Sequence, residues 1–329
     1  MIIYRKSKRN VRFAAGLWIF SSCLDRFCTK GYREETTLER RIELASKVKD
    51  LSGIEVGHPG ETKDLDELKR LLRTHKLVVA MVASDVYSTP KWALGSFSSP
   101  KKEIRDEAIR LTKEAMDVSV ELGCRRVSLW LGQDGFDYPF QVNYLKAWDR
   151  LVEGIGECAD HNRKVTLFLE YKLKEPRTHC FLSDVGKCLM LAREIGRENL
   201  GITIDVGHAL MAQENLAESF ALVHRSKRPL HLHFNDAYRY WDDDMIAGSI
   251  HFWEYLELMT WLERLKYDGW YSLDMYPYRE DPVKACEQSI RNLKWYAELV
   301  KRMGVDRVFE LIESRSIEDI IEFLRESMR

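Results

Sequence analysis

The chain has 329 residues, of which 45% are hydrophobic and 31% charged, and its formal net charge is −1 with a sequence pI near 6.8. This length can hold two ordinary domains or one large α/β barrel, and the composition is typical of a globular protein with an ample core. Because the charge is nearly balanced, neither nucleic acid nor an acidic membrane surface is expected as a partner.

The first apolar stretch, FAAGLWIF, is too short for a membrane-spanning helix and lacks the small-residue cleavage pattern of a signal peptide. The seven cysteines show no CxxC spacing, which favours reduced thiols. We therefore expect a cytoplasmic protein.

Apolar strand candidates alternate with amphipathic helix candidates along the chain. Strands are predicted near residues 12–20, 53–58, 77–87, 125–132, 164–172, 200–206, 229–235 and 269–276. Helices are predicted near residues 36–50, 64–74, 101–122, 143–162, 184–196, 214–226, 250–266 and 282–303. This alternation implies parallel strands and predicts a (β/α)8 barrel over residues 1–303. A doubly wound sheet is the alternative, but no GxGxxG follows the first strand.

Local signals support several of these boundaries. Asp64 precedes LDELKRLL as a helix N-cap does, Gly123 is well placed to end a helix, and Asp281 with Pro282 marks the start of the last barrel helix. Residues 304–329 are predicted to form a tail of one or two short helices, which covers the barrel surface or contacts another subunit.

Residue types that bind metals gather at the ends of the later predicted strands. VTLFLEYK ends in Glu170 and Lys172, which are two residues apart and so point to the same face of a strand. The other candidates follow the next three strands, and they are Asp205, His208, His231, His233, Asp242, Asp244 and Asp274. In a (β/α)8 barrel these strand ends meet at one pocket.

The charges of these side chains point to bound cations. Five carboxylates in one pocket, those of Glu170, Asp205, Asp242, Asp244 and Asp274, cannot all stay ionised without compensation. Two divalent cations together with Lys172 would balance them. The sequence therefore predicts a two-metal site.

The same segments resemble those of a known family. FLEYKLKEPRTHCFLSDVGKCL is similar to the strand-five segment of the xylose isomerases, and IDVGHALMAQENL is similar to their strand-six segment. HLHFND, RYWDDDM and LDMYP continue the resemblance, and GLWIF and LWLGQDG extend it more weakly. It covers about residues 11–300, and the tail after Gly304, much shorter than the C-terminal arm of xylose isomerases, falls outside it.

This resemblance implies a sugar isomerase that interconverts an aldose and a ketose by a metal-assisted 1,2-hydride shift. It places a first metal on Glu170, Asp205, His233 and Asp274, and a second on His208, Asp242 and Asp244, with Asp205 bridging. His233 stands where xylose isomerases have an aspartate, as in the rhamnose isomerases. Since imidazole favours Mn²⁺, Co²⁺ or Zn²⁺ over Mg²⁺, Mn²⁺ is the expected metal.

The resemblance also implies catalytic roles. Lys172 would hydrogen-bond the substrate oxygen where charge develops. The second metal, and with it Asp244, would move a proton between two substrate oxygens. His58, with Glu61 three residues on, would open the sugar ring, although a glycine is inserted before the histidine here.

Three aromatic residues are implied at the substrate. Trp18 and Trp130 would wall the site and exclude water, and Phe27 resembles a loop aromatic that enters a neighbouring subunit's site. A homo-oligomer is therefore expected. For all three, local packing is the alternative.

Other functions on this fold stay open. A single-metal ketose epimerase or related dehydratase would use the first metal site and leave Asp242 and Asp244 without a role. An apurinic endonuclease needs three zinc ions, and the histidine it requires on the third unit is absent from VVAMVASDVY. A non-catalytic sugar-binding barrel would not need Lys172. The isomerase is favoured, and the sequence does not identify its sugar.

Overall fold

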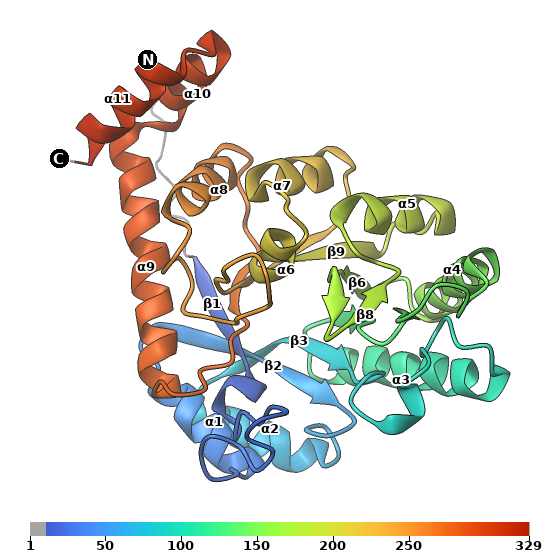
Figure 1. The fold of residues 1–329 in the computed structure, drawn as a ribbon. Coiled ribbons are helices and arrows are strands. Elements are labelled where there is room, and N and C mark those ends of the chain that lie inside the picture. The colour runs from blue at the N-terminus through green and yellow to red at the C-terminus, as the bar shows by residue number, and fades with distance from the viewer. Residues whose placement is uncertain (1–10, 329) are drawn as a thin grey trace.

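The computed structural model describes residues 11–328, whose longest strands close into a parallel barrel ringed by helices (Figure 1). The eight barrel strands are β1 (Arg12–Gly16), β2 (Leu51–His58), β3 (Val78–Ser84), β4 (Arg126–Trp130), β6 (Thr166–Glu170), β9 (Leu200–Asp205), β10 (Leu230–Phe234) and β11 (Trp270–Leu273). Each strand pairs in parallel with the next along the chain, and β11 closes the ring on β1. The predicted (β/α)8 barrel is confirmed. Residues 1–10 of the predicted barrel domain lie outside the described residues.

A helix follows each barrel strand. These helices are α1 (Leu38–Lys47), α2 (Leu65–His75), α3 (Lys102–Glu121), α4 (Tyr144–His161), α5 (Val185–Ile195), α7 (Leu216–Arg225), α8 (Phe252–Arg264) and α9 (Pro282–Met303). Asp64 and Asp281 are N-caps, since their carboxylates accept the backbone N–H of Glu67 and Lys284. All the predicted helices are present, and the main core lies between them and the barrel.

The first predicted strand is shorter than expected. β1 ends at Gly16, and Leu17–Phe20 forms a short 3-10 helix, η1, that carries Trp18. A second 3-10 helix, η2 (Pro90–Trp92), lies in the loop after β3. The prediction of a strand over residues 12–20 is therefore wrong in its second half, because a continuous apolar run does not distinguish a strand from a buried helical turn.

Four more elements lie beside the strand ends. A small antiparallel sheet joins the loops after β4 and β6, and consists of β5 (Gly135–Phe136), β7 (Lys174–Glu175) and β8 (Thr178–Cys180). The short helix α6 (Val206–Met211) follows β9 directly. The loops near the carboxyl ends of β4, β6 and β9 are thus held in defined positions.

The barrel interior changes from apolar to polar along its axis. Ala14, Ala80 and Trp270 form a small apolar cluster near the start of the strands. Above it lie the buried side chains of Glu55 and His231, which hydrogen-bond each other. The next side chains on these faces belong to the candidate site, so polar groups occupy the upper half of the barrel.

The tail is helical, as predicted, and its first helix packs against α8, where Phe309 meets Trp261 and Asp306 pairs with Arg264. It consists of α10 (Val305–Ser314) and α11 (Ile317–Ser327), which project beyond the end of α9 (Figure 1). Because α9 runs antiparallel to the strands, the tail lies at the end of the barrel where the strands begin, away from the strand ends that carry the candidate ligands.

Two further sequence expectations bear on the environment of the chain. All seven cysteines are free thiols, in agreement with the absence of CxxC spacing. Within residues 11–328, no helix has the length and apolar character needed to cross a bilayer.

Candidate active site

A cavity of about 710 Å³ opens at the carboxyl ends of the barrel strands. Most of the predicted site residues line it, namely Trp18, Phe27, Trp130, Glu170, Lys172, His208, His233, Asp242, Asp244 and Asp274. Asp205 lies directly behind this wall and is fully buried. The strand ends of the second half of the chain therefore bring the predicted metal-binding side chains together.

The first group of candidate ligands consists of Glu170, Asp205, His233 and Asp274, which offer ligand atoms within 4.8 Å of one another. Nδ1 of His233 lies 3.0 Å from Asp274 Oδ2 and 3.3 Å from Glu170 Oε1. Ser128 on β4 donates to the other oxygen of Glu170 at 3.1 Å. These are the residues proposed from the sequence for the first metal.

A second group shares Asp205 with the first. Asp205, His208 and Asp242 also offer ligand atoms within 4.8 Å of one another, and His208 Nε2 lies 3.1 Å from Asp242 Oδ2. Asp205 is the N-cap of α6, and its Oδ1 accepts the backbone N–H of His208. Asn235 donates to Asp205 Oδ2 at 2.9 Å and approaches Asp244 Oδ1 at 3.4 Å, so it links these two acids. Asp244, also predicted for the second site, lines the cavity but is not a member of either ligand group.

Lys172 lies beside the second group. Its ammonium is 2.7 Å from Asp242 Oδ2, and it also pairs with Glu175. Burial lowers the pKa of Lys172, but Asp242 and Glu175 outweigh burial and hold that pKa well above its ordinary value. The lysine is therefore a charged donor in the cavity.

Two acids and one histidine of the site have raised pKa values. Burial, with Asp242, raises the pKa of Asp205 to about 7 against the opposing effect of His208. Burial, with Asp242 and Asp274, raises the pKa of Asp244 well above its ordinary value. Burial lowers the pKa of His208, but Asp205 and Asp242 raise it to about 9. Both acids therefore hold a proton more readily than a free carboxylate does, as expected where burial and like charges combine.

The side chains present fit divalent cations. His208 Nδ1 and Asp242 Oδ1 are buried and have no hydrogen-bond partner within residues 11–328. Such unsatisfied atoms are rare in buried sites, and both are metal-ligand types. Both residues belong to the second group, so this group fits a cation with nitrogen and oxygen ligands.

Two tryptophans form walls of the cavity because glycines make room for them. The ring of Trp18 lies over Gly16 and that of Trp130 over Gly132, where a Cβ atom would stand 2.1 Å and 2.4 Å from ring carbons. Trp18 Nε1 donates to Asp274 Oδ1 at 2.6 Å. Trp18 therefore contacts a candidate ligand directly as well as shaping the cavity.

The loop after η1 forms the rim of the cavity. Phe27 lines the cavity with 79% of its surface exposed, and Asp25 accepts the backbone N–H groups of Phe27 and Cys28. An exposed aromatic ring at the rim is compatible with the predicted contact to another subunit, which stays a prediction.

His58 is not brought to the cavity. Its Nδ1 pairs with Thr62 Oγ1 at 2.7 Å, and its Nε2 faces Glu114 of α3 at 3.7 Å. Glu61 instead accepts the N–H of Gly57 and pairs with Arg41. The inserted glycine explains this, because Glu55 and Gly57 take the inward positions of β2 and His58 takes an outward one.

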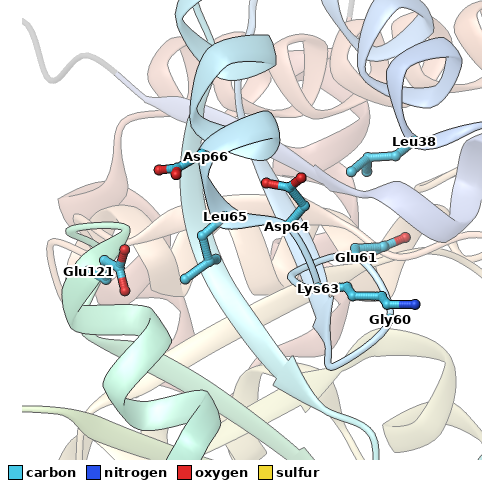
Figure 2. Close-up of a pocket in the computed structure, with 8 residues that line it drawn as sticks. All are labelled: Leu38, Gly60, Glu61, Lys63, Asp64, Leu65, Asp66 and Glu121. Carbon is cyan, nitrogen blue, oxygen red and sulfur yellow. The ribbon is translucent and has the colours of Figure 1, made fainter.

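Glu61 lies at a second hollow, outside the barrel. This hollow of about 530 Å³ lies near the start of α2 and is lined by Leu38, Gly60, Glu61, Lys63, Asp64, Leu65, Asp66 and Glu121 (Figure 2). The three groups of candidate metal ligands found within residues 11–328 all lie elsewhere. We therefore place the candidate active site in the barrel.

Sequence reasoning missed two acids of the site. Glu55 is fully buried on β2 and contacts both His231 and His233. Glu175 lines the cavity beside Lys172. Glu55 could have been found from the sequence, because it is a lone acid within the apolar strand IEVGH. With the period of two of a strand, it also points to the same side as Gly57, into the barrel.

Comparison with protein families gives one match. The model of the xylose isomerase-like TIM barrel family matches residues 42–294, which is most of the chain. Among curated proteins, the chain is 28% identical to a xylose isomerase of Thermus thermophilus over 233 residues, covering 68% of this chain and 60% of that protein. A xylose isomerase of Halalkalibacterium halodurans is 23% identical and covers 66% of this chain. The chain spans 52% to 60% of the length of these relatives.

Solved structures with the same fold are those of proteins named for a different activity. An L-ribulose 3-epimerase superposes with a TM-score of 0.70 at 16% identity, covering 93% of this chain and 99% of that one. A D-tagatose 3-epimerase-like protein superposes with a TM-score of 0.68 at 20% identity, covering 88% and 98%. At these identities the likeness establishes the fold alone.

Proposed function

This chain belongs to the xylose isomerase-like TIM barrel family, and from that membership we propose that it is a metal-dependent sugar isomerase, which interconverts an aldose and a ketose by a 1,2-hydride shift. The observation that carries the proposal is that Asp205 belongs to both ligand groups, so that two cation sites adjoin at one cavity. The curated relatives are named xylose isomerases, which supports a reaction on a sugar.

Different groups in the cavity can take different roles in such a reaction. Divalent cations bound there would polarise the substrate carbonyl as Lewis acids. The ammonium of Lys172, held by Asp242 and Glu175, is a charged donor for the substrate oxygen that gains negative charge. The indole N–H of Trp130 is buried without a partner in the described chain, and is free to donate to a substrate hydroxyl.

The cavity favours an uncharged sugar. Its walls combine acids with the aromatic rings of Trp18, Tyr87, Trp130, Trp241, Tyr276 and Tyr278. Its lysine is already paired with two carboxylates. A phosphorylated sugar would add negative charge to a site rich in carboxylates, and is therefore disfavoured.

Mn²⁺ is the metal we propose for both sites. An imidazole ligand, His233, in the first group and another, His208, in the second move the preference from Mg²⁺ toward Mn²⁺, Co²⁺ or Zn²⁺.

A ketose 3-epimerase is the second candidate function. The structural neighbours are named for this activity. In addition, Glu170 and Asp274 both lie close to His233 Nδ1, as two acids flanking one metal would. Such an enzyme would use those two carboxylates as acid and base, and His208 and Asp242 would then have no part in the reaction.

We also propose that the enzyme is a cytoplasmic homo-oligomer whose tail, residues 304–329, is a unit separate from the barrel. The free thiols support a reducing compartment. The exposed ring of Phe27 at the cavity rim supports a contact with another copy of the chain.

A screen of neutral aldoses and ketoses with Mn²⁺ present tests the proposed function. We expect aldose–ketose interconversion that chelation abolishes, and that Mn²⁺ or Co²⁺ restores more fully than Mg²⁺. Full activity in chelator, with no divalent metal found by elemental analysis, would contradict the proposal.

A further inference from the structure

We propose that Glu55 is a positioning residue, which accepts a proton-bearing nitrogen of His233 and so directs the other imidazole nitrogen at the first ligand group. The inference rests on the proposed metal-dependent function. It assigns a role to an acid that lies beneath the cavity, outside the two ligand groups that share Asp205.

Glu55 is surrounded by donors. It is fully buried on β2 and points into the barrel, where its Oε1 lies 2.9 Å from His231 Nε2 and also accepts the hydroxyl of Ser272. Its Oε2 lies 3.1 Å from His233 Nε2. The carboxylate therefore contacts both inward-facing histidines of β10 and a serine of β11.

The two nitrogens of His233 face different partners. Nε2 faces Glu55, whereas Nδ1 faces Asp274 at 3.0 Å and Glu170 at 3.3 Å. A neutral imidazole carries its proton on one nitrogen and a lone pair on the other. If Nε2 keeps its proton for Glu55, the lone pair of Nδ1 is left for a cation in the first group. A carboxylate on the far nitrogen commonly orients a metal-binding histidine in this way.

The groups around Glu55 agree with this arrangement. Three donors face Glu55, namely the rings of His231 and His233 and the hydroxyl of Ser272. Glu55 is thus a carboxylate, which can only accept hydrogen bonds. Nδ1 of His231 is buried without a hydrogen-bond partner within residues 11–328, as expected for a ring that donates Nε2–H to Glu55.

Glu55, His231 and His233 could alternatively hold a cation among themselves, since they also offer ligand atoms within 4.8 Å of one another. A cation there would need the lone pair of His233 Nε2, which would turn the proton toward Nδ1 and away from Glu55. The protonated nitrogen of His233 therefore distinguishes the two arrangements.

Mn²⁺ binding in a double-mutant cycle tests the proposal. Calorimetric titration of the wild type, Glu55→Gln, His233→Asn and the double variant is expected to show a 10- to 100-fold loss of affinity on Glu55→Gln, on the order of the usual effect of such a partner. In the His233→Asn background, Glu55→Gln should cause no further loss. Asp134→Asn is the matched control, because Asp134 is an equally buried carboxylate that accepts from Ser96 and Ser98 outside the cavity.

Equal Mn²⁺ affinity of Glu55→Gln and the wild type would overturn the proposal, and so would an equal loss in both backgrounds, which would indicate a purely structural role. NMR of isotope-labelled histidine in the metal-free wild type, at a pH high enough for the ring of His233 to be neutral, gives a second readout that needs no variant to fold. We expect a proton on His233 Nε2, and its absence would overturn the role of Glu55. A wild type that binds no Mn²⁺ would instead refute the proposed function, while the histidine spectrum would still decide on Glu55.

Discussion

At the scale of single residues, Asp205 is both the N-cap of α6 and a candidate metal ligand. One oxygen caps α6 by accepting the N–H of His208, and the other accepts a hydrogen bond from Asn235. The cap fixes the first turn of the helix, and this turn carries the imidazole of His208 back toward the carboxylate. The spacing Asp205-x-x-His208 is therefore a helix start and a pair of candidate ligands at the same time.

Asp244 is expected to belong to the second cation site. Asp244→Asn should weaken the binding of a second Mn²⁺ while the first remains bound, and turnover should fall by about 10²- to 10³-fold, as for the loss of one well-placed electrostatic group. The matched control is Asp243→Asn, since the neighbouring carboxylate instead accepts the N–H of Tyr238. Metal analysis together with steady-state kinetics would check this, and normal turnover of Asp244→Asn would remove the second site from the mechanism.

The gathering of acids and histidines at the cavity could be predicted from the sequence because topology fixes it. Parallel strands of a closed barrel end at one edge, so acids and histidines at those ends must meet. The position of His58 could not be predicted by family resemblance, because one inserted residue reverses the face of a strand. The same period of two, applied strictly, places Glu55 inside the barrel.

At the scale of elements, long periodic segments were predictable and short ones were not. The barrel strands and their helices each bury an apolar face, which leaves a repeating pattern in the sequence. The strands β5, β7 and β8 have two or three residues each, and α6 has six, so none is long enough to show a period. These short elements nevertheless carry or adjoin His208 and Glu175.

Gly201 on β9 is expected to be required for the barrel interior. A Cβ atom there would lie 2.6 Å from the ring of Phe168 and 2.9 Å from the carbonyl oxygen of Pro229. Gly201→Ala should therefore lower the free energy of unfolding by about 1–3 kcal/mol, the usual cost of overpacking. Gly60→Ala is the control, since no atom lies within 4 Å of its added Cβ. Denaturant unfolding measures both, and equal stability of Gly201→Ala and the wild type would show that the strand shifts without cost.

At the scale of the whole molecule, folding gathers carboxylates that the unfolded chain keeps apart. The raised pKa values of Asp205 and Asp244 reflect this repulsion, which adds to the cost of burial. Cations that bind the folded chain would remove it. The site and the stability of the barrel are therefore coupled.

Mn²⁺ is accordingly expected to stabilise the chain against heat. At a free concentration 100 times the dissociation constant, a single site adds about 2.7 kcal/mol, and a second site adds to this. A chain of this size should then unfold several degrees higher, as scanning calorimetry would show. His208→Asn combined with Asp274→Asn, which removes a ligand from each group, should abolish the shift. An unchanged transition temperature of the wild type in Mn²⁺ would contradict the assignment of these groups.

The last helix of the tail exposes apolar side chains. α11 has no buried residue, and Ile317 and Ile321 are exposed on it. A contact between this apolar surface and another copy of the chain stays a prediction.

Hydrogen tracing during turnover in D₂O tests the central claim most directly. A hydride that moves from carbon to carbon stays with the substrate, whereas a carboxylate base exchanges its proton with solvent. Glu175 lines the cavity outside both ligand groups, but it is paired with Lys172. We therefore predict that the ketose product carries little deuterium on carbon, in the wild type and in Glu175→Gln alike. Near-complete incorporation in the wild type would contradict the hydride shift. It would mean that a carboxylate of the cavity takes the carbon-bound proton as a base, and would put the assignment of Asp274 as a metal ligand in question first.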